Sequence, residues 1–372
     1  MKKTGTILAV IIFVFTFIFT ACTIGNTSKN SENNTITDNH NTKAITDNAD
    51  AGLKIADFFP LEKDVYMKYK GTGNEYAEYQ TFVEFIKDNI VQIRNINPGT
   101  SLAIVYEIKE GELRKNFFKG EVYYRYDYTD TKDADEIEVL IKEPIRKGTS
   151  WTLGDGTKRS ITEVNKDIAT PIGNYTALEI TSEYKDSVTT DYYVKDLGHV
   201  KKVFKSKDSD FTITSELEKV EKGVPYKERI RFFYPDFNKD KLAYIDKEID
   251  LLTNQDIKAI FEKELKNIPV NSELTKTISD NTKVLNISID SSSKDNNDIV
   301  IVDFSSQLVT EMNAGTSLES MILGSITNTF GSYYQTQNVG ITLEKKPFES
   351  GHIYLELDEF WKVNTDKSYE YK

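Results

Sequence analysis

Apolar and polar residues alternate in short stretches through the first large region of the chain. β-Branched and aromatic residues recur at every second position over 79–85 and 175–180, a period that is typical of strands with one buried face. Glycine-containing turns separate such stretches, at 97–99, 154–156 and 197–198. The pattern predicts an antiparallel β meander over 57–220. Because long sheets twist, we expect a curved sheet or half-barrel with one concave face, and we expect Trp151 to plug one end of it.

The pattern after residue 226 mixes two periods. Strands are predicted at 230–234, 242–249, 284–289, 299–304, 339–343 and 353–357. The first of them should stop at Pro235-Asp236. Apolar residues at helical spacing predict one helix before Pro269 and another that begins near Thr316. The order ββαββαββ predicts an α/β sandwich with its helices on one sheet face.

Both predicted helices carry capping signals at their N-terminal ends. Thr253 or Asn254 can cap the first helix, and Asp256 favours its positive N-terminus. Thr316 and Glu319 have the spacing of a capping box, in which the two residues satisfy each other's free backbone amides. These signals predict where each helix begins.

The first residues have the layout of an export signal. Lys2 and Lys3 precede an apolar run over 7–19, which ends in the four residues 19–22, FTAC. The run of about 13 residues is shorter than the roughly 20 that a helix needs to cross a bilayer, which favours a processed signal. Residues 19–22 resemble the bacterial lipoprotein signal, and this resemblance implies that Cys22 carries a diacylglycerol and becomes the new N-terminus. The alternative is a plain secretory signal or a short anchor, with Cys22 incidental.

Composition suggests how the chain is divided. Asn, Thr, Ser, Asp and Lys dominate from residue 23 to about residue 52, so this segment cannot bury enough apolar surface to offset the cost of ordering it. A charged stretch with Gly223 and Pro225 separates the two periodic regions. We predict five parts: a signal peptide at 1–21, a lipidated cysteine and disordered tether at 22–56, an antiparallel β domain at 57–220, an α/β domain at 227–360 and a C-terminal tail at 361–372.

Charge and cysteine content narrow the classes of partner. The formal net charge is −12, and it becomes −14 once residues 1–21, which contain two lysines, are removed. Nucleic-acid binding needs a clustered basic surface, whereas Lys alternates with Asp and Glu here, so we expect no nucleic-acid partner. The single cysteine rules out a disulfide within the chain. The domains must therefore rely on packing, to which the 21 tyrosines contribute large apolar surfaces.

Few residues suggest metal binding or catalysis. The three histidines are His40 in the predicted tether, and His199 and His352 in different predicted domains, which argues against a histidine metal site or a catalytic triad. Asp295 and Asp298 lie in a segment without the glycine and terminal glutamate of a calcium loop, and we interpret that segment as a solvated turn. No phosphate loop or nucleophile motif occurs in the sequence. We expect no cofactor, no metal and no enzymatic activity.

Some acidic and aromatic residues allow a second interpretation. Asp135, Glu136 and Glu138 could act as acids and bases on a sugar, but their alternation with apolar residues favours an exposed strand face. Asp303 lies within an apolar strand, where we expect it to accept a bond from a neighbouring backbone group rather than to bind a ligand. Four tyrosines could form a platform for a glycan or peptide, although packing in the core is favoured: Tyr123, Tyr124, Tyr126 and Tyr128.

Four segments of the C-terminal region carry a family resemblance. They are Phe233-Tyr234-Pro235-Asp236, the residues 281–286, the residues 299–305, and the passage from 326–330 to 338–343. Together they resemble the GerMN domain of spore germination and sporulation lipoproteins of the GerM type, over Arg229 to Tyr354. The resemblance implies an α/β fold similar to the ring-building motifs of secretion-like assemblies. It also implies an extracytoplasmic, membrane-attached role in spore formation or germination.

Three functions from different classes are compatible with the sequence. The favoured one is a lipid-anchored, non-enzymatic assembly or binding component on the extracytoplasmic face of a bacterial cell membrane. Its partners would be the membrane, through a diacylglycerol anchor, and cell-envelope proteins or peptidoglycan, and a homo-oligomer stays open. The second function is a lipoprotein that holds a cell-wall glycan or lipid on the concave face of the β domain; an open apolar face would favour it, whereas a filled interior would favour assembly. The third is a wall hydrolase, which needs a cleft with two carboxylates and a raised pKa.

Overall fold

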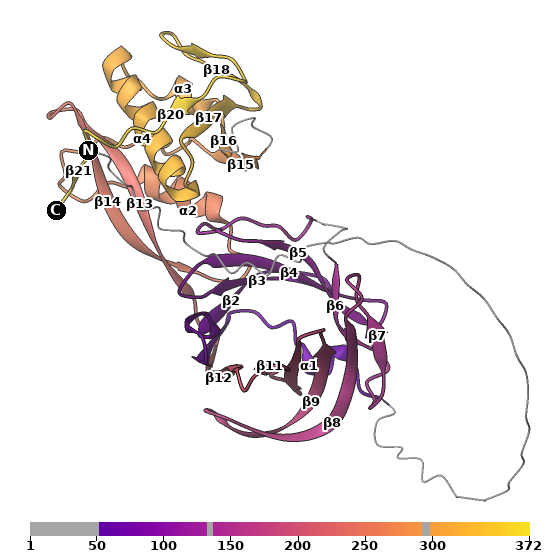
Figure 1. Ribbon diagram of the computed structural model, residues 1–372. Helices are drawn as coiled ribbons and strands as arrows, with labels where there is room; N and C mark the ends of the chain where they lie inside the picture. Colours follow the sequence, from indigo (N-terminus) through magenta and orange to yellow (C-terminus); the bar gives the residue numbers. More distant parts are fainter. Residues whose placement is uncertain (1–51, 132–136, 292–297) are drawn as a thin grey trace, which may run out of the picture. The chain divides into compact units, whose positions relative to one another are not determined.

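The computed structural model describes residues 52–131, 137–291 and 298–372 (Figure 1). The predicted signal, Cys22, His40 and most of the predicted tether lie outside the described residues, as do Asp135, Glu136 and Asp295. None of the helices in the described ranges is long and apolar enough to cross a membrane.

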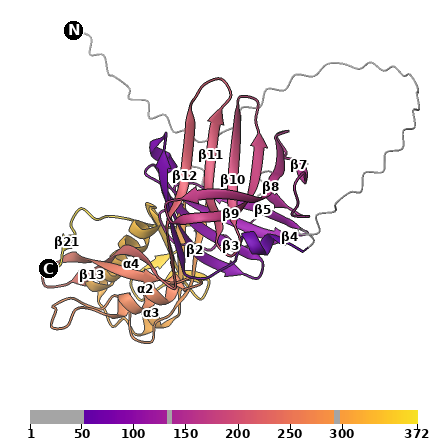
Figure 2. The same ribbon diagram turned by 90° about the horizontal axis from the view of Figure 1, so that it is seen from below.

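Twelve antiparallel strands form one large sheet, which we call the near-barrel. The strand order is β6-β5-β4-β3-β2-β1-β12-β11-β10-β9-β8-β7, and β12, β11 and β10 lie side by side in Figure 2. The sheet confirms the predicted meander and its curvature. Its strands are β1 (Val65–Thr72), β2 (Tyr79–Lys87), β3 (Ile90–Ile96), β4 (Ser101–Lys109), β5 (Glu112–Lys119), β6 (Glu138–Lys142), β7 (Ser150–Thr152), β8 (Lys158–Thr170), β9 (Gly173–Glu183), β10 (Ser187–Val194), β11 (Gly198–Ser206) and β12 (Thr212–Lys222), with a 3₁₀ turn, η2 (Glu75–Ala77), after β1.

Side chains fill the interior of the near-barrel. A short helix, α1 (Ile55–Phe58), lies within the curve of the sheet (Figure 1). Its residues Ile55 and Phe58 are buried in one apolar cluster with residues of β5 to β10, among them Leu113, Trp151 and Ile180. The Glu143 carboxylate accepts a hydrogen bond from Ile55 N at 3.1 Å, and Asp196 N donates to Asp57 O at 2.7 Å. The concave face is therefore occupied by the chain's own apolar residues.

The two end strands of the near-barrel are joined by side chains at a place that we call the seam. β6 and β7 occupy opposite ends of the strand order. The Trp151 indole N–H on β7 donates to Val139 O on β6 at 3.0 Å, and Arg159 Nη1 on β8 donates to the same oxygen at 2.8 Å. Arg159 also forms an ion pair with Glu138 at 2.7 Å. Trp151 thus lies at one end of the sheet, as its sequence context predicts.

The remaining strands form two smaller sheets with helices. One sheet has the order β13-β14-β21, and the other runs β15-β16-β17-β18-β19, with β20 paired to β17. The pairs β14–β21 and β16–β17 are parallel. The elements are β13 (Tyr226–Asp236), β14 (Lys241–Leu251), α2 (Ile257–Lys266), β15 (Val284–Asp290), β16 (Ile299–Phe304), α3 (Gln307–Thr310), α4 (Thr316–Tyr334), β17 (Asn338–Leu343), β18 (Lys346–Glu349), β19 (Tyr354–Leu355), β20 (Trp361–Lys362) and β21 (Tyr369–Glu370).

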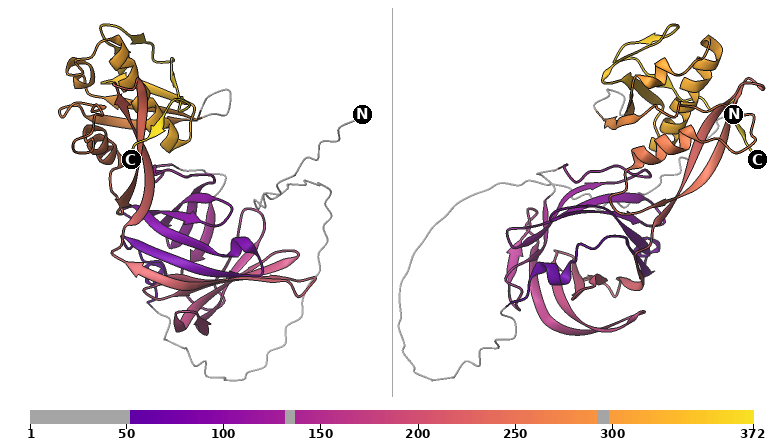
Figure 3. Two further views of the ribbon diagram at one scale, coloured as in Figure 1. Left: turned by 90° about the vertical axis from the view of Figure 1, so that its left-hand side faces the viewer. Right: turned by 180° about the vertical axis from the view of Figure 1, so that it is seen from behind.

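The long helix α4 lies between these two sheets (Figure 1 and Figure 3). Phe330 of α4 packs against Phe261 of α2 and Phe304 of β16, with ring centroids 4.5 and 6.3 Å apart. Thr329 Oγ1 accepts a hydrogen bond from Phe233 N of β13 at 2.9 Å, so a helix occupies the edge where a further strand would pair. This contact explains why the strands divide into two sheets instead of the single sheet that their order predicts.

The predicted end of the first strand at Pro235-Asp236 is confirmed: β13 ends at Asp236. Pro235 pairs opposite Leu242 at a sheet edge, where its missing N–H is not needed. The predicted N-caps of both helices are wrong. Asp256 is the cap of α2, since its carboxylate accepts a bond from Lys258 N. Thr316 is not the cap of α4: Gly315 takes that position and no side chain caps it.

Candidate functional site

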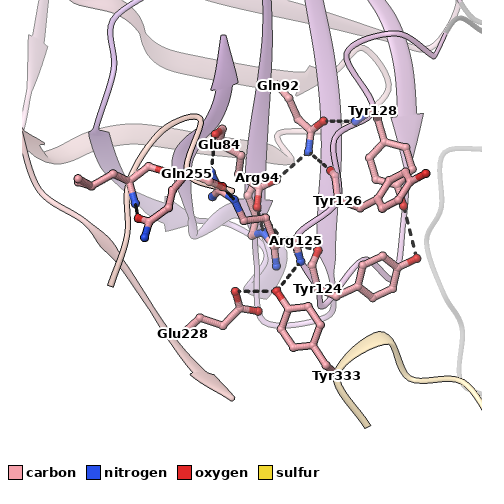
Figure 4. Close-up of polar contacts among 11 residues, drawn as sticks. Glu84, Gln92, Arg94, Tyr124, Arg125, Tyr126, Tyr128, Glu228, Gln255 and Tyr333 are labelled. Carbon is pink, nitrogen blue, oxygen red and sulfur yellow. Dashed lines mark hydrogen bonds and ion pairs between the residues drawn. The ribbon is translucent and has the colours of Figure 1, made fainter. Parts of the chain in front are cut away.

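A buried polar cluster joins the near-barrel to the C-terminal sheets, and we call it the junction. It consists of six residues, drawn in Figure 4: Glu84, Gln92, Arg94, Arg125, Glu228 and Tyr333. An apolar cluster adjoins it in which residues of β4 and of the segment after β5 pack with residues of β13, α2 and α4. The two regions that differ in sequence pattern therefore share one core.

The near-barrel contributes a buried ion pair to the junction. Arg94 on β3 contacts Glu84 on β2, with Nη2 2.7 Å and Nε 2.8 Å from Oε1. Gln92 Nε2 donates to the other carboxylate oxygen of Glu84 at 2.8 Å. Burial opposes the charge on Arg94, but Glu84 together with Glu228 and two tyrosines outweighs burial and raises the pKa of the guanidinium. A buried pair with both carboxylate oxygens bonded is a fixed structural element.

The same side chains hold an irregular segment that follows β5. Gln92 accepts a bond from Tyr128 N at 2.7 Å and donates to Tyr126 O at 2.8 Å, while Arg94 Nη2 donates to Tyr124 O. The segment has no strand partner for these backbone groups, and buried backbone groups need one. Two polar side chains of β3 therefore take the place of a partner strand and fix the path of the chain through the core.

Arg125 is the central residue of the junction. It is 0% exposed, and its Nη2 donates to Glu84 O and Leu252 O, each at 2.8 Å. Its Nε donates to Gln255 O at 3.2 Å, and its guanidinium carbon lies 4.4 Å from the centre of the Phe85 ring. Nη1 has no hydrogen-bond partner among the described residues. Burial lowers the pKa of Arg125, since carbonyl oxygens compensate a charge less than a carboxylate does.

Glu228 and Tyr333 complete the junction from the C-terminal side. Arg125 N donates to the Tyr333 hydroxyl at 2.9 Å, and this hydroxyl lies 3.3 Å from Oε2 of Glu228. Glu228 is 8% exposed, and the described cations form no ion pair with it. Burial raises its pKa to about 7; the charge of Glu84 adds to this rise, whereas Arg94 opposes it. Glu228 can therefore gain or lose a proton near neutral pH.

A second group of bonds lies beside the junction. Thr253 Oγ1 donates to Val83 O at 2.7 Å and accepts from Asp64 N at 2.8 Å. Asn254 accepts from Ile86 N at 2.7 Å and donates to Ile86 O at 2.9 Å. Thr253 and Asn254 are the residues that the sequence pattern suggests as helix caps. Their side chains instead pair with backbone groups of the near-barrel.

The predicted candidate residues do not come together in one site. His199 lies 3.0 Å from Asp191 within the near-barrel, and His352 lies 2.7 Å from Glu319 beside α4. Asp303 Oδ1 accepts bonds from Thr342 Oγ1 and Lys345 N, at 2.7 and 2.8 Å, which confirms its expected structural role. Within the described residues, no His, Cys, Asp and Glu side chains gather in a way that could hold a metal ion.

The tyrosine group and Glu138 are also structural. Tyr124 and Tyr128 are buried and Tyr126 packs against the same core, which confirms packing for these three, whereas Tyr123 is exposed and donates to Glu121 at 2.7 Å. Glu138 is not on an open strand face but between Lys115 and Arg159. Burial opposes its charge, yet these two cations outweigh burial and lower its pKa to about 2.

Sequence reasoning overlooked the junction because its partners are distant in sequence. One signal was available: Glu84 shares the buried strand face of Phe82, where a charge needs a partner. Two surface grooves, of about 590 and 550 Å³, are lined by other residues, over β9 to β11 and beside α1. The junction is thus a closed structural site and not an open pocket.

Comparisons with known proteins agree with the predicted family resemblance. Residues 231–349 match the family model Germane, which is described as sporulation and spore germination. No curated protein matches the sequence. Among solved structures, the tandem GerMN domains of the sporulation protein GerM from Bacillus subtilis align with 38% of this chain and 48% of that chain, at 20% identity and a TM-score of 0.29. This chain thus spans about half the length of that structure.

Two further structures align with part of the chain. A candidate lipoprotein from Parabacteroides distasonis has 14% identity and a TM-score of 0.27, over 44% of this chain and 98% of that one. Another, from Clostridium perfringens, has 18% identity and a TM-score of 0.23, over 36% of this chain and 87% of that one. The match to the family model rests on sequence: residues 231–349 are similar to the Germane family of sporulation and spore germination proteins.

Proposed function

We propose that this chain is a lipid-anchored, non-enzymatic component of the cell envelope. Its Germane domain contacts envelope proteins or peptidoglycan during sporulation or germination, and a diacylglycerol on Cys22 holds it at the extracytoplasmic face of the membrane. The family match over 231–349 is the observation that carries this proposal. A scaffold role also agrees with a junction that joins both folded regions through one core.

The filled interior of the near-barrel favours assembly over ligand binding. Ile55 and Phe58 occupy the concave face, together with Trp151 and the apolar residues of six strands. A ligand site is usually a preformed apolar cavity with a few polar groups, and a glycan or lipid would have to displace these side chains. The near-barrel therefore serves better as a rigid support for the Germane domain than as a carrier.

The carboxylates of the junction argue against a wall hydrolase. Glu228 has the raised pKa that a general acid needs, and Glu84 is a second carboxylate in the same cluster. However, their side chains are enclosed by Arg94, Arg125 and Tyr333 and are at most 8% exposed. A polysaccharide cannot reach them, so the raised pKa belongs to a structural group.

The anchor is tested by changing its sulfur. We expect Cys22→Ser to abolish incorporation of radiolabelled palmitate and to move the protein from the membrane fraction to the soluble fraction, because serine has no thiol to be alkylated. Thr23→Ser keeps the sulfur and should behave like the wild type. Membrane retention of Cys22→Ser at wild-type levels would contradict the lipid anchor, and absence of label in the wild type would do so as well.

The assembly role is tested by site-specific photo-crosslinking in sporulating cells. A photoreactive residue at Phe237 or Leu285, which are 55% and 42% exposed within residues 231–349, should give adducts with envelope proteins or peptidoglycan. Phe211 of the near-barrel, 49% exposed, is the matched control position and should give fewer adducts. Recovery of small-molecule adducts alone would reject assembly in favour of ligand binding.

A further inference from the structure

Two buried groups of the junction are only partly satisfied. Nη1 of Arg125 has no hydrogen-bond partner among the described residues, and Glu228 has one hydroxyl contact, with Tyr333 at 3.3 Å. A buried ionised group with too few partners is costly. Arg125 has an N–H group without an acceptor, and the Glu228 carboxylate can accept further hydrogen bonds, so each could bond to the other. Their charges also act on each other.

The neighbours of Glu228 make the cluster sensitive to one proton. Arg94 faces it from β3, Glu84 from β2 and Arg125 from the segment after β5, and all three act on its charge. The other facing groups are tyrosines: Tyr333 and Tyr334 of α4 and Tyr226 of its own strand. With two arginines and Glu84 charged, loss of the proton from Glu228 makes the cluster neutral, whereas its presence leaves one net positive charge.

We propose that the junction is a proton-operated lock in which the charge of Glu228 decides which partners Arg125 binds. With Glu228 protonated, Arg125 donates to the carbonyls of Glu84, Leu252 and Gln255 and ties β2 to the connection before α2. When Glu228 releases its proton to solvent, its carboxylate attracts the free Nη1. The guanidinium then turns away from Leu252 and Gln255, and the joint between the near-barrel and the Germane domain loosens.

Hydrogen exchange on the full chain in detergent micelles tests the lock. A shift from an ordinary glutamate pKa to about 7 predicts that local opening rises about tenfold between pH 6 and pH 8.5, after correction for intrinsic exchange. The rise should be confined to peptides that cover 122–131 and 252–256. Peptides from β9 are the internal reference and should change little. Glu228→Gln imitates the protonated form and should remove the rise.

Two variants separate the lock from general effects of pH. Glu107→Gln is the matched control, because Glu107 is 7% exposed and accepts from Asn116 Nδ2 at 2.6 Å; its response should equal that of the wild type. Tyr333→Phe removes the hydroxyl that donates to Glu228 and so raises the pKa of Glu228 further, which should extend the rise in opening to higher pH. Three results would each overturn the proposal. They are an undiminished rise in opening in Glu228→Gln, a rise of equal size in the β9 peptides, and an unchanged midpoint of the rise in Tyr333→Phe.

Discussion

The seam and the junction use the same residue types with opposite results. At the seam, Arg159 forms an ion pair with Glu138, and Lys115 contacts the same carboxylate. At the junction, Arg125 donates to carbonyl oxygens, and the one hydrogen bond of Glu228 among the described residues comes from a tyrosine hydroxyl. The first glutamate has a pKa lowered to about 2, and the second has a pKa raised to about 7. Direct pairing, and not burial alone, decides the direction of the shift.

The two glutamates therefore stabilise the fold in different pH ranges. The folded-state pKa of Glu138 lies below its ordinary value of 4.5, so its contribution is present above pH 4.5 and is lost as the pH falls through about 2. The folded-state pKa of Glu228 lies above that value, so its contribution is present below pH 4.5 and is lost as the pH rises through about 7. At alkaline pH the contribution of Glu138 at the seam is retained, whereas the contribution of Glu228 at the junction is lost.

The largest effect is expected from Arg125→Met. The change removes the guanidinium that donates to the carbonyls of Glu84, Leu252 and Gln255 and packs on the Phe85 ring. The free energy of unfolding should therefore fall by about 4 kcal/mol. Urea unfolding at pH 6 measures this. Arg114→Met is the control: Arg114 pairs at the surface with Glu110 and Glu112, and its loss should cost less than about 1 kcal/mol. Equal losses in the two variants would show that Arg125 does not hold the joint.

A pair of glutamine variants tests the opposite signs directly. At pH 8.5, Glu228→Gln should raise the free energy of unfolding by roughly 3 kcal/mol, because an amide has no charge to bury. Glu138→Gln should lower the same quantity by roughly 2 kcal/mol, because its two cations lose their partner. Urea unfolding at pH 5 and pH 8.5 measures both. Effects of the same sign at pH 8.5 would remove the distinction between seam and junction.

The smallest effect concerns one donor at the seam. Trp151→Phe keeps an aromatic ring but removes the indole N–H that donates to Val139 O. Since Arg159 still donates to that oxygen, the free energy of unfolding should fall by about 1 kcal/mol. This fall should be the same from pH 5 to pH 8.5. Trp361→Phe is the matched control, because the buried indole nitrogen of Trp361 has no hydrogen-bond partner in the part of the chain that the structure describes. Thermal unfolding of both variants measures the difference. A greater loss in Trp361→Phe would contradict this account of the seam.

Local patterns predicted the elements well and their long-range contacts poorly. Alternation placed β2 and β9, and an apolar stripe placed α2, because these signals come from neighbours in sequence. The role of Thr253 was missed, since its partners Asp64 and Val83 lie 189 and 170 residues away. Arg125 was missed for the same reason: its bonds reach Leu252 and Tyr333, 127 and 208 residues along the chain.

The helix α1 gives the near-barrel a mechanical property. A pull on the chain at Gly52 reaches Ile55 and Phe58 before it reaches β1, which begins at Val65. These two side chains are held by apolar contact, which weakens over a short displacement, whereas the twelve-stranded ladder must break many backbone bonds together. Besides these contacts, α1 has hydrogen bonds to Glu143 and Asp196, far fewer than the sheet has, so we expect it to detach under load while the strands stay paired. Under tension, α1 should therefore yield before the sheet does.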